Sequence, residues 1–322
     1  MALITAYLPK EPSRCHDRPV KSFVPDGNGQ ARLADVDEVS PAAGEAVIAV
    51  EAFSVNRGET FLLDDPPAGW RPGKDIAGRV VRAAADGTGP RAGTRVVGHP
   101  PSRGWAERAA VRTSVLVELP DEVAAVTAAA LPLAGLTALR LLRAAGPLIG
   151  RRLLITGASG GVGHYVTELA IASGAEVTAV SASPERGARL AALGAVVVSD
   201  PADAPGRYDT VMESAGGRSL AAARRKARTT GTVLWFGQAS RTPATIDFFD
   251  WVDGTAGAPI VAFGYERPDF ADDRDLATLV RLTVAGRLHP EIGALLPWDR
   301  TPCVIDAIRA RRLRGNAVLT IG

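Results

Sequence analysis

The fold of this 322-residue chain is decided by the stretch Leu153-Leu154-Ile155-Thr156-Gly157-Ala158-Ser159-Gly160-Gly161-Val162-Gly163. An apolar strand runs directly into a glycine-rich turn, and a helical pattern follows over residues 166–171. Small residues are required there because a pyrophosphate must approach the backbone amides at the start of the helix. The turn reads Ala-x-Gly-x-x-Gly and predicts a dinucleotide site made by Ala158, Ser159, Gly160, Gly161, Val162 and Gly163. The alternative is a tight strand-to-helix turn without a ligand.

The residues after the next strand indicate which dinucleotide is bound. The strand at 176–180 ends at Ser181, 18 residues after Gly163, close to the place where an NAD site carries an acidic residue for the ribose hydroxyls. No acid stands there, whereas Ser181, Ser183 and Arg186 offer hydroxyls and a guanidinium that suit a 2′-phosphate. The sequence therefore favours NADP(H) over NAD. The two serines could also cap the helix that begins at Pro184, and both roles can coexist.

Outward from this turn, the chain divides into two textures. From residue 124 onward, helical patterns alternate with apolar strands, which predicts a parallel sheet with helices on both faces. Before residue 117, short β-like runs are broken by Gly, Pro and Asp, as in a compact β-rich domain. We expect helices at 124–145, 161–173, 184–192, 217–227, 272–286 and 300–312, and strands at 152–156, 176–180, 195–198, 208–212, 231–236 and 317–321.

The composition excludes several classes of protein. Lys and Arg number 37 against 35 Asp and Glu, so no basic excess points to nucleic acid. Two cysteines, Cys15 and Cys303, are too few for a disulfide framework, and no stretch of about 20 apolar residues predicts a membrane span. We therefore expect a cytoplasmic protein without a metal site, a membrane anchor or a nucleic-acid partner.

Seven stretches together resemble the medium-chain dehydrogenase/reductase superfamily, in its zinc-free quinone oxidoreductase branch, which zeta-crystallin typifies. The resemblance covers nearly the whole chain, and the order and spacing of the stretches make it specific. They are residues 54–56 (Ser-Val-Asn), 71–78 (Arg-Pro-Gly-Lys-Asp-Ile-Ala-Gly), 93–98, 104–107, 131–138, the glycine turn, and 286–290.

The resemblance implies a Rossmann domain with a doubly wound parallel sheet, inserted into a GroES-like β-rich domain. The expected boundaries are 1–125 for the β-rich catalytic domain, 126–265 for the Rossmann domain, and 266–322 for a C-terminal segment that returns to the catalytic domain. It also implies an active site in the cleft between the domains and a homodimer. The cysteines that hold zinc in related alcohol dehydrogenases are missing between residues 54 and 112, so a tetrahedral zinc site cannot be assembled there.

Three residues are candidates for the chemistry itself. Asn56 matches a family asparagine beside the nicotinamide, although it could instead close a turn. Phe61 stands where many relatives carry a tyrosine, and a phenyl ring cannot donate a proton. Protonation of the product then falls to water, or to Lys74 or Tyr265.

Further cofactor contacts are expected where strands end, because ligands of open parallel sheets lie across the carboxyl ends of the strands. Thr137 matches a family position near the cofactor, or bonds back to its own helix. Asn316 stands where relatives carry a polar residue directed into the cleft. The complete set predicted on these grounds is Thr137, Ser214, Gly237, Gln238, Phe263, Gly264, Tyr265 and Asn316.

The resemblance and the turn together predict an NADPH-dependent, zinc-independent oxidoreductase that transfers hydride to a quinone or an α,β-unsaturated carbonyl. Conjugation in such an acceptor supplies the electron sink, so the protein mainly aligns the reactants and stabilises the enolate oxygen. Two alternatives remain open: an enoyl-thioester reductase of secondary metabolism, and a non-catalytic NADP(H)-binding redox sensor.

Overall fold

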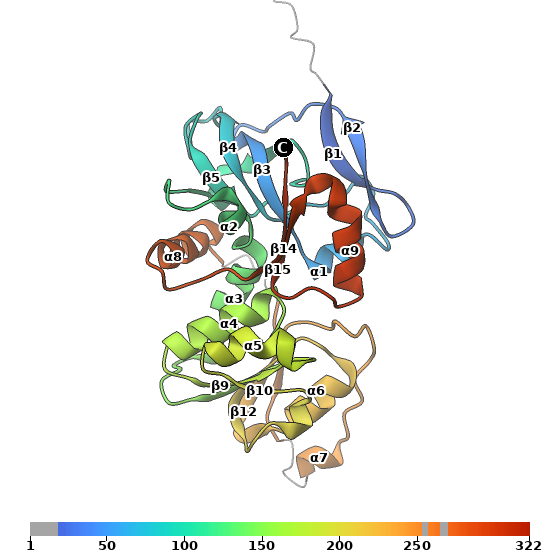
Figure 1. Cartoon of the computed structure of the whole chain (residues 1–322), viewed down its shortest axis with the longest axis vertical. Coiled ribbons are helices and arrows are strands. Elements are labelled where there is room, and N and C mark those ends of the chain that lie inside the picture. The colour runs from blue at the N-terminus through green and yellow to red at the C-terminus, as the bar shows by residue number, and fades with distance from the viewer. Residues whose placement is uncertain (1–18, 253–256, 265–269) are drawn as a thin grey trace, which may run out of the picture.

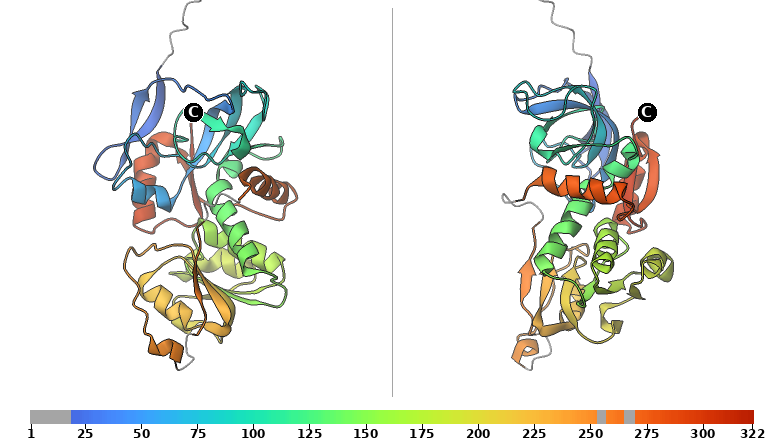
Figure 2. Two further views of the ribbon diagram at one scale, coloured as in Figure 1. Left: turned by 180° about the vertical axis from the view of Figure 1, so that it is seen from behind. Right: turned by 90° about the vertical axis from the view of Figure 1, so that its left-hand side faces the viewer.

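The computed structural model describes residues 19–252, 257–264 and 270–322. Two lobes are stacked end to end, a β-rich lobe that contains the early strands and an α/β lobe that contains the middle of the chain (Figure 1). Helix α3 runs between them, as the views from behind and from the side show (Figure 2).

The α/β lobe is built on a six-stranded sheet in the order β10-β9-β8-β11-β12-β13, with every pairing parallel. The order reverses between β8 and β11, and in open parallel sheets the carboxyl ends of the strands at such a reversal are where ligands bind. The strands are β8 (Arg152–Ile155), β9 (Glu176–Val180), β10 (Val196–Val198), β11 (Tyr208–Glu213), β12 (Ala227–Trp235) and β13 (Ile260–Ala262).

Helices cover both faces of this sheet. Leu153 and Ile155 of β8 pack with α3 and α4 in one core, whereas Leu154 packs with Leu220 of α6 in another, because successive side chains of a strand point to opposite faces. The helices are α3 (Pro132–Ala145), α4 (Gly161–Ala172), α5 (Pro184–Ala192), α6 (Gly217–Arg224) and the short α7 (Phe249–Val252). The sheet is therefore doubly wound, as predicted.

The helix expected over 124–145 is in fact two helices, α2 (Ala125–Ala129) and α3. Pro132 is the first residue of α3, a position that suits proline because it has no backbone N–H to donate to the preceding turn. Alanine-rich periodicity continues across the break, which explains why the sequence pattern alone did not reveal it.

The β-rich lobe contains a seven-stranded sheet in the order β14-β15-β3-β4-β5-β7, with β6 also paired to β3, and a separate β1–β2 hairpin. The C-terminal strands β14 and β15 belong to this sheet, so the end of the chain returns to the lobe where it began. Its strands are β1 (Val20–Pro25), β2 (Ala31–Val36), β3 (Glu45–Val55), β4 (Ile76–Arg82), β5 (Arg95–Gly98), β6 (Arg108–Arg112), β7 (Leu116–Glu118), β14 (Ile292–Pro297) and β15 (Asn316–Thr320).

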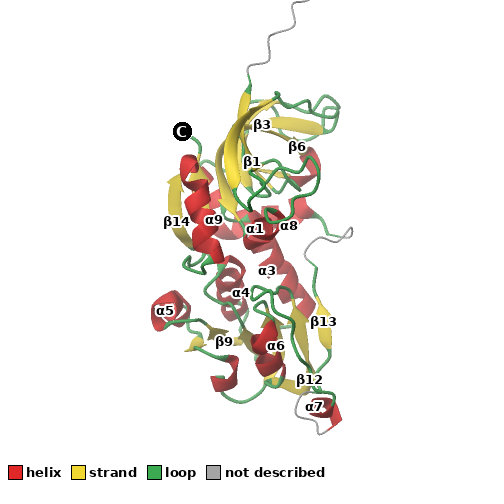
Figure 3. Cartoon of the chain, turned by 90° about the vertical axis from the view of Figure 1, so that its right-hand side faces the viewer, coloured by secondary structure: helices red, strands yellow, loops and turns green. Residues whose placement is uncertain are grey.

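Helices α1 (Arg57–Leu62), α8 (Asp272–Val284) and α9 (Thr301–Arg309) complete this lobe. The structure confirms the predicted class, a Rossmann domain inserted into a GroES-like β-rich domain. Helices α1, α3 and α4 lie at the junction of the lobes (Figure 3). Across the junction, the amide of Gly315 donates to the carbonyl of Ser159 at 2.9 Å, so the C-terminal segment contacts the glycine turn. Every helix within the described ranges is too short or too polar to cross a bilayer.

Candidate cofactor and acceptor site

The glycine turn joins β8 to α4 at this reversal of strand order, and Gly160 is the N-cap of the helix. A methyl group at Gly163 would clash with the carbonyl of Ala158, so only glycine allows the helix to approach the turn this closely. Gly157 has a φ of +61°, the left-handed region that favours glycine. The turn therefore has the close, side-chain-free approach to a helix N-terminus that a pyrophosphate requires.

The predicted contacts that follow β11 and β12 lie beside this turn. The hydroxyl of Ser214 donates to the carbonyl of Thr156 at 3.0 Å, and a methyl group on Gly157 would lie 2.5 Å from the same hydroxyl. Gly237 also lies beside Ser214, since a methyl group there would lie 3.0 Å from the carbonyl oxygen of Ser214. Gln238 is the next residue. The ends of three neighbouring strands thus converge, as the reversal of strand order predicts.

Asn316 and Thr137 are both buried near the junction, with different partners. A methyl group on Gly161 would lie 2.5 Å from the side-chain oxygen of Asn316, so this amide is packed against the turn. Its nitrogen donates to the carbonyl of Glu291 at 3.2 Å. The Thr137 hydroxyl donates to the carbonyl of Leu133 at 2.7 Å, which is the bond to its own helix that the sequence left open.

The residues predicted to hold a 2′-phosphate lie at the end of β9, and their hydroxyls have local partners. The Ser181 hydroxyl donates to the carbonyl of Ser183, and the Ser183 side chain accepts from the amide of Arg186 as the N-cap of α5. The capping role of Ser183 is therefore present. The Arg186 guanidinium donates to the Ser159 hydroxyl at 3.2 Å and to carbonyls of the C-terminal segment, including Leu313 at 2.6 Å. It lies directly at the glycine turn.

Two further guanidinium groups lie near Arg186. Arg186 donates to the backbone carbonyl of Arg311, and Arg57 begins α1 on the other side of the junction. Burial first, and then repulsion from Arg311 and Arg186, lower the pKa of Arg57. Three cations gathered at the junction favour an anionic ligand, because an opposite charge relieves their mutual repulsion.

A buried polar network lies in the catalytic lobe around Asp75, which is completely buried. One of its oxygens accepts hydrogen bonds from the Ser54 hydroxyl at 2.6 Å and from the Asn56 amide at 2.7 Å. The other accepts from the amide of Leu133, just inside α3, at 2.9 Å, and lies 3.2 Å from Nδ1 of His99. Asp75 therefore fixes the Asn56 side chain and ties it to the start of the helix that runs between the lobes.

Glu59 is a second buried carboxylate in the same network. It accepts from the amide of Asn56 at 3.0 Å and from the amides of Gly73 at 2.7 Å and Lys74 at 3.1 Å. Burial, followed by repulsion from Asp75, raises the pKa of Glu59 to about 7. The carboxyl group therefore holds the loop that carries Lys74 and Asp75.

The structure places the remaining predicted residues as follows. Lys74 is buried beside Asp75, and its carbonyl lies 2.8 Å from Nδ1 of His99. Phe263 and Gly264 follow β13, and the Phe263 amide donates to the carbonyl of Trp235 at 2.9 Å. Tyr265 lies outside the described residues.

Sequence reasoning did not find Asp75, Glu59 or Arg241 as site residues. The Arg241 guanidinium lies 4.5 Å from the centre of the Phe61 ring and pairs with Asp64 at 2.6 Å, so a loop of the Rossmann lobe contacts α1. The position that lacks a tyrosine hydroxyl thus carries a cation–π contact between the lobes. A signal for Asp75 was present, since an acid inside a Gly-Lys-Asp-Ile-Ala-Gly run of a buried strand needs several donors.

Within the described residues, no group of three or more His, Cys, Asp or Glu side chains is arranged to hold a metal ion. Three groups meet at the junction. They are the backbone amides of the glycine turn, the guanidiniums of Arg57, Arg186 and Arg311, and the buried Asn56, which Asp75 and Glu59 hold. This set, on a doubly wound sheet joined to a β-rich lobe, is the arrangement expected of a two-domain dehydrogenase fold.

Comparison with known proteins places the chain more closely. Residues 161–276 match the family model described as zinc-binding dehydrogenase. A chloroplast envelope quinone oxidoreductase homolog from Arabidopsis thaliana is 33% identical over 232 residues, which are 59% of this chain and 66% of that protein. An acrylyl-CoA reductase from Ruegeria pomeroyi is 31% identical over 194 residues, 53% of this chain and 56% of that protein. The matched stretches span between about half and two thirds of these relatives.

The Escherichia coli quinone oxidoreductase, solved in complex with NADPH, superposes with a TM-score of 0.83 at 18% identity, covering 94% of this chain and 99% of that one. The fold is therefore shared along almost the whole length. These matches support the resemblance to the medium-chain dehydrogenase/reductase superfamily, in its zinc-free quinone oxidoreductase branch.

Proposed function

We propose that the chain is an NADPH-dependent, zinc-independent oxidoreductase that reduces quinones or α,β-unsaturated carbonyls. The observation that carries the proposal is the turn at 157–163, whose glycines leave the helix N-terminus open to a pyrophosphate beside Arg57, Arg186 and Arg311. The names of the Arabidopsis and Escherichia coli proteins support the acceptor class and the cofactor. All of the predicted cofactor residues keep that role in the proposal.

The residues present fit a pyridine dinucleotide, because Gly163 lets the start of α4 approach the turn at Ala158 more closely than any larger residue would allow. When bound, the dinucleotide supplies a hydride to the acceptor. Asp75 and Glu59 hold the loop that carries Lys74, and Asp75 orients the Asn56 amide for the nicotinamide or the acceptor carbonyl. Protonation of the product then comes from water, from Lys74 or from Tyr265.

The decisive experiment is an assay of NADPH oxidation with a panel of quinones and enones. We expect turnover with at least one acceptor, and tighter binding of NADPH than of NADH by fluorescence titration. Tight NADPH binding without oxidation by any acceptor would support the redox-sensor alternative. Failure of both nucleotides to bind would overturn the proposal altogether.

We also propose a homodimer that forms through the outer strand of the Rossmann sheet. Strand β13 is the last strand in the sheet order, and Val261 is 44% exposed. Phe248, Phe249 and Trp251, in and beside α7, are exposed large apolar side chains. An apolar edge strand that pairs with only one other strand among the described residues invites pairing with another chain, so light scattering should give a dimer mass, and Val261→Lys should lower it. A cytoplasmic location also remains a prediction.

A further inference from the structure

We propose that a groove in the catalytic lobe binds an anionic group carried by the acceptor, through Arg71 and Arg103. This groove, called here the Arg71 groove, has a volume of about 870 Å³ and is lined by residues 36–40, 99–103, 110–112 and 114–115 together with Glu45, Arg71 and Asp272. The inference rests on the proposed function, because it assigns the substrate class of the same site.

The end of the groove that carries Arg71, His99 and Arg103, called its inner end, adjoins the buried network around Asp75. His99 lines the groove, and its Nδ1 lies 3.2 Å from Asp75, whose other oxygen accepts from Asn56. Arg71 begins the segment Arg71-Pro72-Gly73-Lys74, whose last two amides are held by Glu59. A ligand in the groove would therefore be separated from Asn56 by the side chains of His99 and Asp75.

The two arginines are held side by side by the backbone. The amide of Arg103 donates to the carbonyl of Arg71 at 3.0 Å, and the amide of Gly104 donates to that of Gly73 at 2.9 Å. Arg103 has a φ of +68°, a left-handed conformation that is rare for a residue with a side chain. Such strain persists only where the surrounding structure enforces it, and it is concentrated at functional sites.

Neither guanidinium group has a hydrogen-bond or ion-pair partner among the described residues of the chain. Arg71 is half-buried, and burial followed by repulsion from Arg103 lowers its pKa. Two neighbouring cations without a counterion, one of them partly removed from water, are stabilised by any anion that reaches both.

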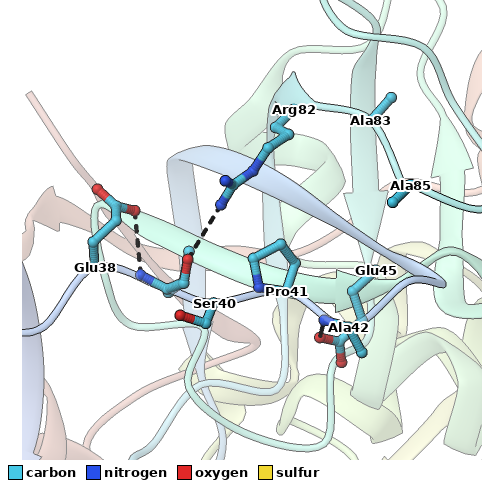
Figure 4. A pocket seen from close by; sticks show the side chains of 9 residues that line it. Glu38, Ser40, Pro41, Ala42, Glu45, Arg82, Ala83 and Ala85 are labelled. Atoms are coloured by element: carbon cyan, nitrogen blue, oxygen red, sulfur yellow. Dashed lines mark hydrogen bonds between the residues drawn. The ribbon is translucent and has the colours of Figure 1, made fainter. Parts of the chain in front are cut away.

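The acidic residues that line the groove are Asp37, Glu38, Glu45 and Asp272, and none of them pairs with Arg71 or Arg103. Glu38 pairs with Arg108 at 2.6 Å, and Asp272 pairs with Arg140 at 2.6 Å. Beside the outer end, an adjoining hollow of about 340 Å³ shows the contrast, because its arginine, Arg82, donates to the carbonyl of Val39 at 3.2 Å, and Glu45 accepts from the amide of Ala42 (Figure 4). In the adjoining hollow, Arg82 and Glu45 therefore have hydrogen-bond partners within the protein. At the inner end of the groove, Arg71 and Arg103 are left to bind a ligand.

A guanidinium pair of this kind binds phosphate or carboxylate, and the groove is large enough to hold most of a small organic ligand. Two classes of activated acceptor carry such a group. One is an enoyl thioester of a phosphopantetheine carrier, whose phosphates lie far from the reacting double bond. The other is a conjugated ketone that bears a carboxylate.

The experiment compares matched acceptors in the wild type and in Arg71→Gln. Crotonyl-coenzyme A is paired with the neutral crotonyl thioester of N-acetylcysteamine, and 4-oxo-2-pentenoate is paired with its methyl ester. We expect Arg71→Gln to lower the ratio of kcat/KM for the anionic member to that for the neutral member about tenfold, through KM, in one of the two pairs. Arg103→Asn, which tolerates the left-handed backbone, should act in the same direction. Arg32→Gln, an exposed arginine on β2, is the control and should leave both ratios unchanged.

The pair that responds identifies the anion as a phosphate or a carboxylate. Unchanged ratios in both pairs would overturn the inference while leaving the proposed function in place. If the wild type reduces no acceptor, the proposed function fails. The groove is then judged by calorimetry with coenzyme A and with 4-oxo-2-pentenoate, neither of which needs turnover for binding. Binding of one of them that is lost in Arg71→Gln supports the groove, and equal or absent binding in the two proteins refutes it.

Discussion

The glycine turn and the Asp75 network lie in different lobes of one chain and are built on opposite principles. The turn is made by backbone amides and by the absence of side chains, within seven consecutive residues. The network is made by side chains, and it joins Ser54, Asn56, Asp75, His99 and the amide of Leu133. A site made from local backbone can be found in a sequence, whereas a site made from distant side chains needs the fold.

The largest expected effect is that of Asp75→Asn, which should disrupt the Asp75 network and leave the glycine turn intact. The side chain of the variant would carry an NH₂ group in place of one carboxylate oxygen. This group cannot accept the hydrogen bonds that Asp75 now receives, so Asn56 would lose its fixed orientation. We expect kcat/KM to fall about 100-fold, mainly in kcat, while NADPH affinity at the turn stays within about twofold. Steady-state kinetics and fluorescence titration measure the two quantities.

The control for this variant is Asp65→Asn, an exposed aspartate just after α1. It should change neither value. A loss of NADPH affinity in Asp75→Asn as large as the loss of kcat would contradict the division of labour between the two regions.

The second effect acts on the turn, through Gly163→Ala. Its methyl group meets the backbone of Ala158, which cannot move aside without opening the turn. We expect a loss of about 2 kcal/mol in the free energy of unfolding together with weaker NADPH binding. Gly58→Ala is the matched control, because Gly58 lies in the first turn of α1 with no atom within 4 Å of the added methyl group. If Gly163→Ala binds NADPH as tightly as the wild type, the turn does not hold the pyrophosphate.

Features that depend on neighbouring residues could be predicted from the sequence, whereas contacts between distant side chains could not. The strand at 176–180 and the helix at 184–192 were predicted with their observed bounds, because hydrophobic periodicity and the cap at Ser183 are local signals. The predicted contacts at Ser214 and Gly237 converge as expected, since strand order alone brings them together. The resemblance names Asn56 as a candidate, but it does not name Asp75, the hydrogen-bond partner of Asn56, because the two residues lie 19 positions apart in the chain. Propensity gives no information about which distant side chains will meet.

The third effect uses the pKa of Glu59 to examine the network by pH. The pKa is raised from the ordinary value near 4.5 to about 7, so the folded protein holds this proton more tightly than the unfolded chain does. The contribution of Glu59 to stability is therefore complete below pH 4.5 and is lost as the pH rises through 7. We expect urea denaturation to show a decrease in the free energy of unfolding on the order of 2 kcal/mol from this group between pH 5 and 8.

In Glu59→Gln this component of the pH dependence should disappear, although the variant loses backbone hydrogen bonds and is less stable at low pH. Glu51→Gln, an exposed residue of β3, removes an equal charge and should keep the wild-type dependence. Parallel pH profiles for the wild type and Glu59→Gln would show that burial does not raise the pKa of Glu59.

The smallest effect concerns the preference for NADPH over NADH, which we assign to the arginines beside the glycine turn. Arg186 lies against Ser159 and the C-terminal segment, with Arg57 and Arg311 nearby. If its charge supports a 2′-phosphate, Arg186→Ala should lower the ratio of NADPH to NADH affinity about fivefold to tenfold, because Arg57 and Arg311 remain. Arg189→Ala removes the same charge one turn further along α5, where the side chain pairs with Glu291 at 2.5 Å, and should lower stability without changing the ratio. An unchanged ratio in Arg186→Ala would limit this arginine to joining α5 to the C-terminal segment, and nucleotide choice would then depend on the other two guanidiniums.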